Sequence, residues 1–319
     1  MPNYQGVWSL STHYQNRTGW PTFDPTRGVF AGGATPDDGG FNTIEYIEIS
    51  TKGNASDFGD LTVARGRNAG FGSTTRGVFG GGTDNSNALN TIDYITISST
   101  GNASDFGDLS SVKEYVAGLS NSTRGVFGGG MNGFSDIKNV IEYVTIANTG
   151  NVTDFGDLAA TTANPAGLAS STRGVFGGGQ TSDTIDVMQY ITIGSTGNSS
   201  DFGDMTVALG QRGGASSSVR GIYFGGRTGG GSVSDVIDYI TIASTGNAAD
   251  FGNLTAATRE VTATSNLTTA VRGGGTTGSF VNVMDSVVIA TTGDATDFGD
   301  LTTTRSALAA TSNGHGGLA

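Results

Sequence analysis

The side chains that could perform chemistry are few. The sequence has no cysteine and only two histidines, His13 and His315. Without cysteine, a thiol nucleophile, a disulfide and a cysteine-ligated metal are all excluded. The two histidines lie in opposite terminal segments, so no Ser/His/Asp set can form between them inside the chain's central region. We therefore expect no enzyme activity, cofactor or metal, although two suitably spaced carboxylates for glycoside hydrolysis remain an open alternative.

The most regular acidic feature is the block Asp-Phe-Gly-Asp/Asn, which begins at residues 57, 105, 154, 201, 250 and 297. A kinase Asp-Phe-Gly motif is excluded because none of the other kinase motifs surrounds it. The recurring final aspartates suggest calcium, but the EF-hand loop spacing is absent and Asn253 interrupts the series. The glycine triplets also lack the Lys-Ser/Thr and the helix of a phosphate-binding loop.

These blocks belong to an internal repeat. Their starting points are separated by 48, 49, 47, 49 and 47 residues. Two further blocks recur at the same spacing and become less regular towards the C-terminus. They are Thr-Arg-Gly-Val-Phe-Gly-Gly-Gly and Ile-Asp/Glu-Tyr-Ile-Thr-Ile. Six copies of a unit of about 48 residues therefore run from about residue 26 to the end.

Each unit is expected to hold four short strands. Residues 77–80 form an apolar strand that ends in glycines, and residues 92–98 are rich in Ile, Tyr and Thr, which favour strands. The Thr-Gly-Asn turn at 100–102 follows, then a short strand around Phe106 and another at 111–119. Four strands in a unit of this length are typical of a propeller blade. The sequence predicts an all-β, six-bladed β-propeller.

The unit resembles the kelch repeat. The matching positions are Leu61 and Arg65, the diglycine at 80–81, Tyr94, and Phe106 where kelch units usually have Trp. The resemblance covers about nine tenths of the chain and implies four-stranded, kelch-like blades.

The sequence of the repeats also resembles that of virion-associated proteins of marine tailed phages, cyanophages included. Near-identical units of Arg-Gly-Val-Phe-Gly-Gly-Gly, Ile-Asp-Tyr-Ile-Thr-Ile and Thr-Gly-Asn-Ala-Ser-Asp-Phe-Gly-Asp-Leu carry this resemblance. The opening segment 4–10 and the later Gly-Trp-Pro at 19–21 look like a segment of phage tail and appendage proteins. The resemblance implies a virion location, with other virion proteins and a host-surface glycan or protein as partners.

Composition narrows the partners further. The net charge of −12 and the isoelectric point near 4.4 argue against nucleic-acid binding. No apolar run is long enough for a transmembrane helix, so membrane insertion is not expected. The N-terminus has neither the basic patch nor the apolar core of a signal peptide, which favours synthesis in the host cytoplasm. A homo-oligomer is compatible with these observations.

The repeats differ from one another mainly on one face of the expected ring. We letter the four strands of a blade a to d from the centre outwards, so that the a–b and c–d turns lie on one face of the ring, and the b–c loops and the d–a crossings to the next blade lie on the other. The turns are nearly constant among the copies, whereas the b–c loops and the crossing position of Arg65 change. Because recognition usually lies on loops held by a rigid scaffold, these positions are candidate ligand contacts, with loop drift as the alternative. The candidates are Asp37, Asp38, Phe41, Arg65, Asp84, Asn85, Lys113, Met131, Phe134 and Arg227.

Repeated charges receive the opposite interpretation. Arginines recur at 27, 76, 124, 173 and 220, and acids recur at 45, 93, 142 and 238. A residue present in every blade is expected to belong to the scaffold, where charge-assisted bonds would tie a turn to the neighbouring blade.

The expected organisation is a docking segment at residues 1–25 followed by the propeller at residues 26–319. Both tryptophans, Trp8 and Trp20, lie in the first segment, and large aromatics often anchor interfaces. The first repeat lacks a preceding inner strand, so residues 305–312 are expected to complete it beside Val29 and Phe30 and to close the ring.

The sequence thus predicts a non-enzymatic phage virion protein, either a tail fibre or appendage or a decoration protein, that adheres to the host through its variable loops. Two alternatives stay open. One is a propeller enzyme that degrades host glycan, and the other is a purely structural subunit whose loops contact other virion chains.

Overall fold

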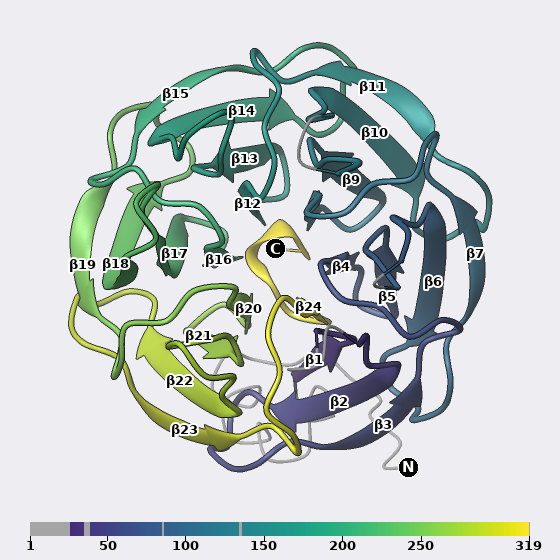
Figure 1. Ribbon diagram of the computed structural model, residues 1–319, viewed down its shortest axis with the longest axis horizontal. Coiled ribbons are helices and arrows are strands. Elements are labelled where there is room, and N and C mark those ends of the chain that lie inside the picture. Colours follow the sequence, from purple (N-terminus) through teal and green to yellow (C-terminus); the bar gives the residue numbers. More distant parts are fainter. Residues whose placement is uncertain (1–25, 35–38, 85, 134–135, 319) are drawn as a thin grey trace, which may run out of the picture.

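A computed structural model describes residues 26–34, 39–84, 86–133 and 136–318. Six four-stranded antiparallel sheets stand around a common axis, as the predicted six-bladed β-propeller requires (Figure 1). Within the described residues, no helix is both long and apolar enough to span a bilayer.

The blades follow one another along the chain. Blade 1 contains β1 (Arg27–Ala31), β2 (Thr43–Glu48), β3 (Ser56–Asp60) and β24 (Ala309–Ser312). Blade 2 contains β4 (Ala69–Gly72), β5 (Arg76–Gly80), β6 (Thr91–Thr96) and β7 (Ser104–Asp108). Blade 3 contains β8 (Ala117–Ser120), β9 (Arg124–Gly128), β10 (Val140–Thr145) and β11 (Thr153–Asp157).

The second half repeats this order. Blade 4 contains β12 (Ala166–Ala169), β13 (Arg173–Gly177), β14 (Val187–Thr192) and β15 (Ser200–Asp204). Blade 5 contains β16 (Gly213–Ser216), β17 (Arg220–Arg227), β18 (Val233–Thr241) and β19 (Ala249–Asn253). Blade 6 contains β20 (Thr262–Ser265), β21 (Thr269–Gly273), β22 (Val283–Val288) and β23 (Thr296–Asp300), and the 3-10 helix η2 (Gly316–Leu318) follows blade 1's last strand.

The C-terminal strand closes the ring. β24 pairs antiparallel with β1, with Val29 opposite Thr311 and Phe30 opposite Ala310. Blade 1 therefore takes three strands from the first repeat and its innermost strand from the last. This confirms the predicted closure and gives β1 a partner along its inner edge.

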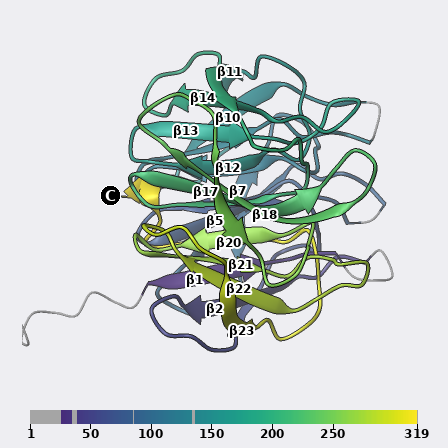
Figure 2. The same cartoon turned by 90° about the vertical axis from the view of Figure 1, so that its left-hand side faces the viewer.

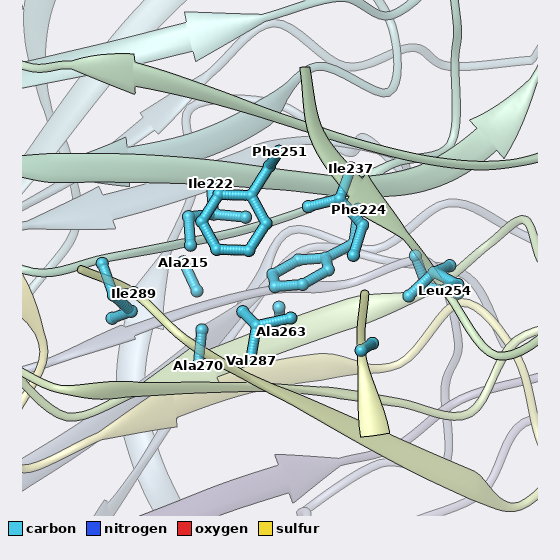
Figure 3. Packing of buried hydrophobic residues seen from close by; sticks show 12 residues of the cluster. Ala215, Ile222, Phe224, Ile237, Phe251, Leu254, Ala263, Ala270, Val287 and Ile289 are labelled. Atoms are coloured by element: carbon cyan, nitrogen blue, oxygen red, sulfur yellow. The ribbon is translucent and has the colours of Figure 1, made fainter. Parts of the chain in front are cut away.

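The hydrophobic core is divided among the blade interfaces. Six clusters of buried residues are found, and each joins two neighbouring blades. Between blades 5 and 6, Phe224 and Phe251 pack against Val287 and Ile289, all at most 5% exposed (Figure 3). A strand with apolar groups on both faces fits this arrangement because each sheet is covered on two sides. The blades are thus stabilised by contact with each other.

The constant c–d turns have a structural cause. Gly59 in β3 adopts φ +148°, and a Cβ there would lie 2.4 Å from the carbonyl oxygen of Gly101 in the next blade. The Asn102 side chain accepts a hydrogen bond from the Asp60 backbone N–H at 3.1 Å. The same pair of contacts recurs at every blade interface, so the Asp-Phe-Gly-Asp and Thr-Gly-Asn blocks hold neighbouring blades together.

The repeated arginines also bind the neighbouring blade. Arg76 stacks over the ring of Tyr94 at 4.3 Å, and its Nη1 donates to the Ile146 carbonyl of blade 3 at 2.8 Å. Arg27, Arg124, Arg173 and Arg220 make the equivalent contacts. This confirms their expected scaffold role. Blade 6 departs from it, because Thr269 and Ser286 stand where the other blades have arginine and tyrosine.

The ring has two different faces. The turn face carries the a–b and c–d turns, and the loop face carries the b–c loops and the d–a crossings. Both ends of the described chain meet on the turn face, where Arg27 N–H donates to Asn313 Oδ1 at 2.9 Å. Figure 2 shows the C-terminal end on that side of the ring.

Candidate binding surface on the loop face

The b–c loops and d–a crossings of the loop face surround one mouth of the central channel. In each blade, the residue that follows the strand b glycines pairs with the crossing, as in the bridges Gly66–Thr83, Glu114–Met131 and Gly210–Arg227. The crossings and b–c loops therefore form one continuous rim.

Six residues with left-handed backbone line this mouth. Each blade contributes one, two positions after the crossing residue equivalent to Arg65. They are Arg67, Tyr115, Asn164, Gln211, Glu260 and Ala307, with φ between 51° and 62°. We call this set the mouth ring. Within the described residues, these are the only non-glycine positions with positive φ, while 27 glycines also adopt it.

The backbone of the mouth ring is hydrogen-bonded from blade to blade. Tyr115 N–H donates to Arg67 O at 2.9 Å, Asn164 N–H to Tyr115 O at 2.9 Å, and Glu260 N–H to Gln211 O at 3.0 Å. Ala307 continues the pattern to Glu260, and Arg67 donates to Ala307 at 2.6 Å. The backbone is thus nearly six-fold while the side chains all differ.

The side chains form a connected polar surface. Arg67 Nη1 lies 2.8 Å from Glu114 Oε2, and its guanidinium lies 4.9 Å from the centre of the Tyr115 ring. On the other side, Gln211 Nε2 donates to Glu260 Oε1 at 3.2 Å. Arg227 Nε donates to Gln211 Oε1 at 2.9 Å, which links the b–c loop of blade 5 to the ring.

Electrostatics keep these groups in defined states. Burial raises the pKa of Tyr115 and Glu260 raises it further, so the phenol stays neutral. Burial acts to lower the pKa of Arg67, but Tyr115, Glu114 and Glu260 outweigh it and the pKa is raised. The mouth therefore holds a permanent cation, balanced by two carboxylates.

The mouth opens into a blind pocket of about 120 Å³. Its floor is a ring of small residues at the centre of the inner strands. They are Gly70, Gly118, Gly167, Gly214, Ala263 and Ala310. A Cβ on Gly118 would lie 2.7 Å from Gly70 O, so these strands approach one another backbone to backbone. The channel is consequently narrowest there.

The C-terminal segment closes the channel on the turn face. His315 Nδ1 accepts from Gly317 N–H at 3.2 Å, so Nε2 carries the proton and donates to Gly72 O at 3.0 Å. A Cβ on Gly317 would lie 1.9 Å from Ser120 O, which shows how tightly η2 sits against the inner strands. Only the loop-face mouth stays open to a ligand.

Three expected contacts require correction. Arg65 and Lys113 are 0% and 1% exposed, and they pair with Asp93 at 2.9 Å and Glu142 at 2.5 Å. Met131 is also buried, at 1% exposure. None of the three side chains is available to a ligand on the loop face, because each fills the space beneath the rim.

The variation at the position of Arg65 has an internal cause. The strand c acid accepts hydrogen bonds from the crossing, as Glu142 does from Ser110 N–H at 3.1 Å, and therefore needs a buried cation. In blades 5 and 6 the cation comes from Arg212 and Arg272. In blade 4, Gln189 accepts from Ala159 N–H at 2.7 Å without a charge, and the crossing position is Thr162.

The remaining candidates have different positions. Phe41 is half-buried, with its ring centre 5.8 Å from the Arg305 guanidinium, so it covers the ion pair of Arg305 with Glu45. Asp84 is exposed, and its Oδ1 accepts from Asn87 N–H at 2.8 Å within its own loop. Arg227 lies at the mouth as described above. Asp37, Asp38, Asn85, Phe134, Trp8 and Trp20 lie outside the described residues.

The mouth ring was missed by the sequence analysis, which selected the position two residues earlier. A signal was available, because 67, 115, 164, 211, 260 and 307 carry six different residue types between nearly constant strands. Their left-handed backbone, which decides their direction, depends on the d–a crossing and could not be inferred from residue types that are not glycine.

Fold and surface together define a closed six-bladed β-propeller with one plugged and one open mouth. No known family model matches the chain, and a search of curated proteins finds no match. Across the described ranges, no three acidic or histidine side chains gather in a way that could hold a metal ion.

Proposed function

We propose that this chain is a virion protein of a tailed phage, a kelch-like propeller that adheres to a host-surface glycan or protein through its loop face. The sequence of the repeats carries the phage resemblance, and the difference between the uniform turn face and the diverse loop face supports adhesion. Uniform turns and both ends of the described chain occupy the turn face. Diverse polar side chains occupy the open mouth on the opposite side.

This polarity suits a displayed module. Thr26, the first described residue, lies on the turn face, because its carbonyl oxygen accepts from Ile49 N–H at 2.9 Å beside the c–d turn. Attachment to a particle through that side would leave the loop face directed outwards. Several copies on one particle would raise a weak contact to useful avidity.

Competition for adsorption tests the proposal. Purified wild-type protein should block adsorption of the phage whose particles carry it. Asn132→Ala with Phe134→Ala, both in the blade 3 loop, should compete more weakly at an unchanged melting temperature. Leu267→Ser on the turn face, where Leu267 is 48% exposed, is the matched control and should compete like wild type.

Three outcomes would contradict adhesion. Normal competition by the loop variant together with poor incorporation into particles would make the loop face an assembly contact. A position inside the particle in a reconstruction of the intact virion would exclude display. Turnover of purified host polysaccharide by the protein would support the enzyme alternative instead.

A further inference from the structure

The side chains of the mouth ring occupy backbone positions that favour glycine. Left-handed φ disfavours side chains because Cβ crowds the backbone, and non-glycine residues held there are concentrated at ligand sites. Within the described residues, glycine occupies 27 other positive-φ positions but none of the six in this ring. Five of the six carry polar side chains, which indicates that polar groups are needed at this mouth.

Folding alone does not account for these side chains. Glycine would supply the inter-blade backbone bonds of the ring equally well, and the inter-blade side-chain bonds of Arg67 with Glu114 and of Gln211 with Glu260 do not involve Asn164. Asn164 makes the point most sharply, because its Nδ2 is buried and no described residue accepts a hydrogen bond from it. An unpaired buried donor lowers stability unless a group outside the chain accepts from it, and Asn164 borders the open pocket, where a ligand could bring such a group.

The chemistry of the lining indicates an uncharged, hydroxyl-rich ligand. Arg67, Asn164, Glu260 and the neutral Tyr115 all line the pocket, which brings hydrogen-bond donors and acceptors together around it. The charged residues that line the pocket are Arg67, Arg212 and Glu260. Arg67 pairs with Glu114, Arg212 pairs with Asp238, and Arg227 lies beside Gln211 at the rim, so three arginines face three carboxylates and neither charge is in strong excess. A sugar hydroxyl both donates and accepts, which suits such a mixed surface.

Size and symmetry agree with a single sugar ring. The pocket of about 120 Å³ approaches the roughly 150 Å³ of an engineered cavity that holds a benzene ring, and it opens at the mouth, so one six-membered ring can enter with its substituents at the rim. The small-residue floor prevents a ligand from passing through the channel. Six different side chains on a six-fold backbone distinguish the edges of an asymmetric ring.

We propose that the mouth ring is a binding site for one neutral pyranose, the terminal sugar of a longer glycan. This inference rests on the proposed adhesion function, and it names the ligand class and the place of its recognition. The rest of the glycan would extend outwards over the b–c loops.

Glycine substitutions separate binding from folding. Asn164→Gly should keep or raise the melting temperature, because glycine tolerates φ +56° and the unpaired donor is removed. It should weaken sugar binding about tenfold through the lost hydrogen bond. Asn164→Asp keeps the size but replaces the donor with an acceptor, so it should weaken binding similarly. Leu267→Gly, in the exposed a–b turn of blade 6 on the turn face, is the control and should leave sugar binding unchanged.

Purified protein would be titrated singly with glucose, galactose, mannose and N-acetylglucosamine, using calorimetry and saturation-transfer NMR. Binding of at least one sugar at millimolar concentration, with the variant pattern above, is the expected result. No binding by any of the four, or wild-type binding by Asn164→Gly, would overturn the site. Attachment of the wild-type protein to host cells, measured in parallel, reports on adhesion independently of this outcome.

Discussion

Lys113 Nζ lies 2.5 Å from Glu142 Oε2, and both side chains are 1% exposed. In the next blade, Thr162 and Gln189 occupy the same two places and carry no charge. The carboxylate and the amide make the same bond to the crossing, so the cation is required only where the acid is present. The interior of the ring therefore tolerates either a complete ion pair or a neutral pair.

This relationship predicts a strong coupling in blade 3. Glu142→Gln or Lys113→Thr alone should lower the free energy of unfolding by about 3–5 kcal/mol, since each leaves a buried charge unpaired. The double variant copies blade 4 and should recover most of that loss. Chemical denaturation of the four proteins gives the coupling energy, and additive losses would contradict the interpretation.

The vacant stack in blade 6 predicts a stabilising change. Thr269→Arg with Ser286→Tyr should recreate the arginine–tyrosine stack and offer a donor to Ile49 O, the counterpart of Ile146 O. We expect a gain of about 1 kcal/mol from the stack. The reverse pair in blade 3, Arg124→Thr with Tyr143→Ser, should lower stability. The denaturation midpoint should therefore rise for the blade 6 variant and fall for the blade 3 variant. A shift of the same sign and size in both variants would disprove the role of the stack.

The C-terminal plug is expected to loosen in acid. Burial lowers the pKa of His315 to about 4, against about 6.5 in an unfolded chain. The unfolded segment thus binds more protons between these values, so the stabilising contribution is complete above about pH 6.5 and is lost as pH falls towards 4.

Hydrogen exchange of residues 313–318 should therefore accelerate between pH 7 and about pH 5, after correction for the intrinsic rate. His315→Gln has no titrating ring and serves as the control. A plug that opens with the same pH dependence in both proteins would attribute the effect to other groups.

Ring closure predicts the consequence of a truncation. Deletion of residues 302–319 removes β24, Arg305 and the plug, which exposes the edge of β1 and leaves Glu45 without its cation. We expect insoluble or oligomeric protein, because an open sheet edge pairs with other chains. Size-exclusion chromatography and thermal melting provide the test. A soluble monomer with a cooperative transition would show that closure is dispensable.

The two tryptophans carry a prediction about assembly. Trp8 and Trp20 lie outside the described residues, in the segment that precedes Thr26 in the sequence. Trp8→Ala with Trp20→Ala should leave the melting temperature of the propeller unchanged and abolish incorporation into particles, because large aromatics anchor interfaces. Particle composition measured after complementation would decide. Normal incorporation of the double variant would contradict the docking role.

Repetition let the sequence determine the architecture by itself. Six copies of about 48 residues with four strand patterns each can bury their apolar faces only against one another. The missing first strand then indicated where the C-terminal strand must pair. The recurring arginines could be assigned to the scaffold for the same reason, since a residue that recurs in five of the six blades serves a contact that recurs between blades.

Tertiary structure alone decided which variable positions reach solvent. Arg65 and Arg67 are two residues apart in a crossing without regular periodicity, yet one is buried against Asp93 and the other lines the mouth. Their directions follow from the left-handed turn at Arg67 and from the neighbouring blade, which sequence spacing does not encode. The substitution of charge by Thr162 and Gln189 likewise became interpretable only when the two side chains were placed in equivalent, buried positions.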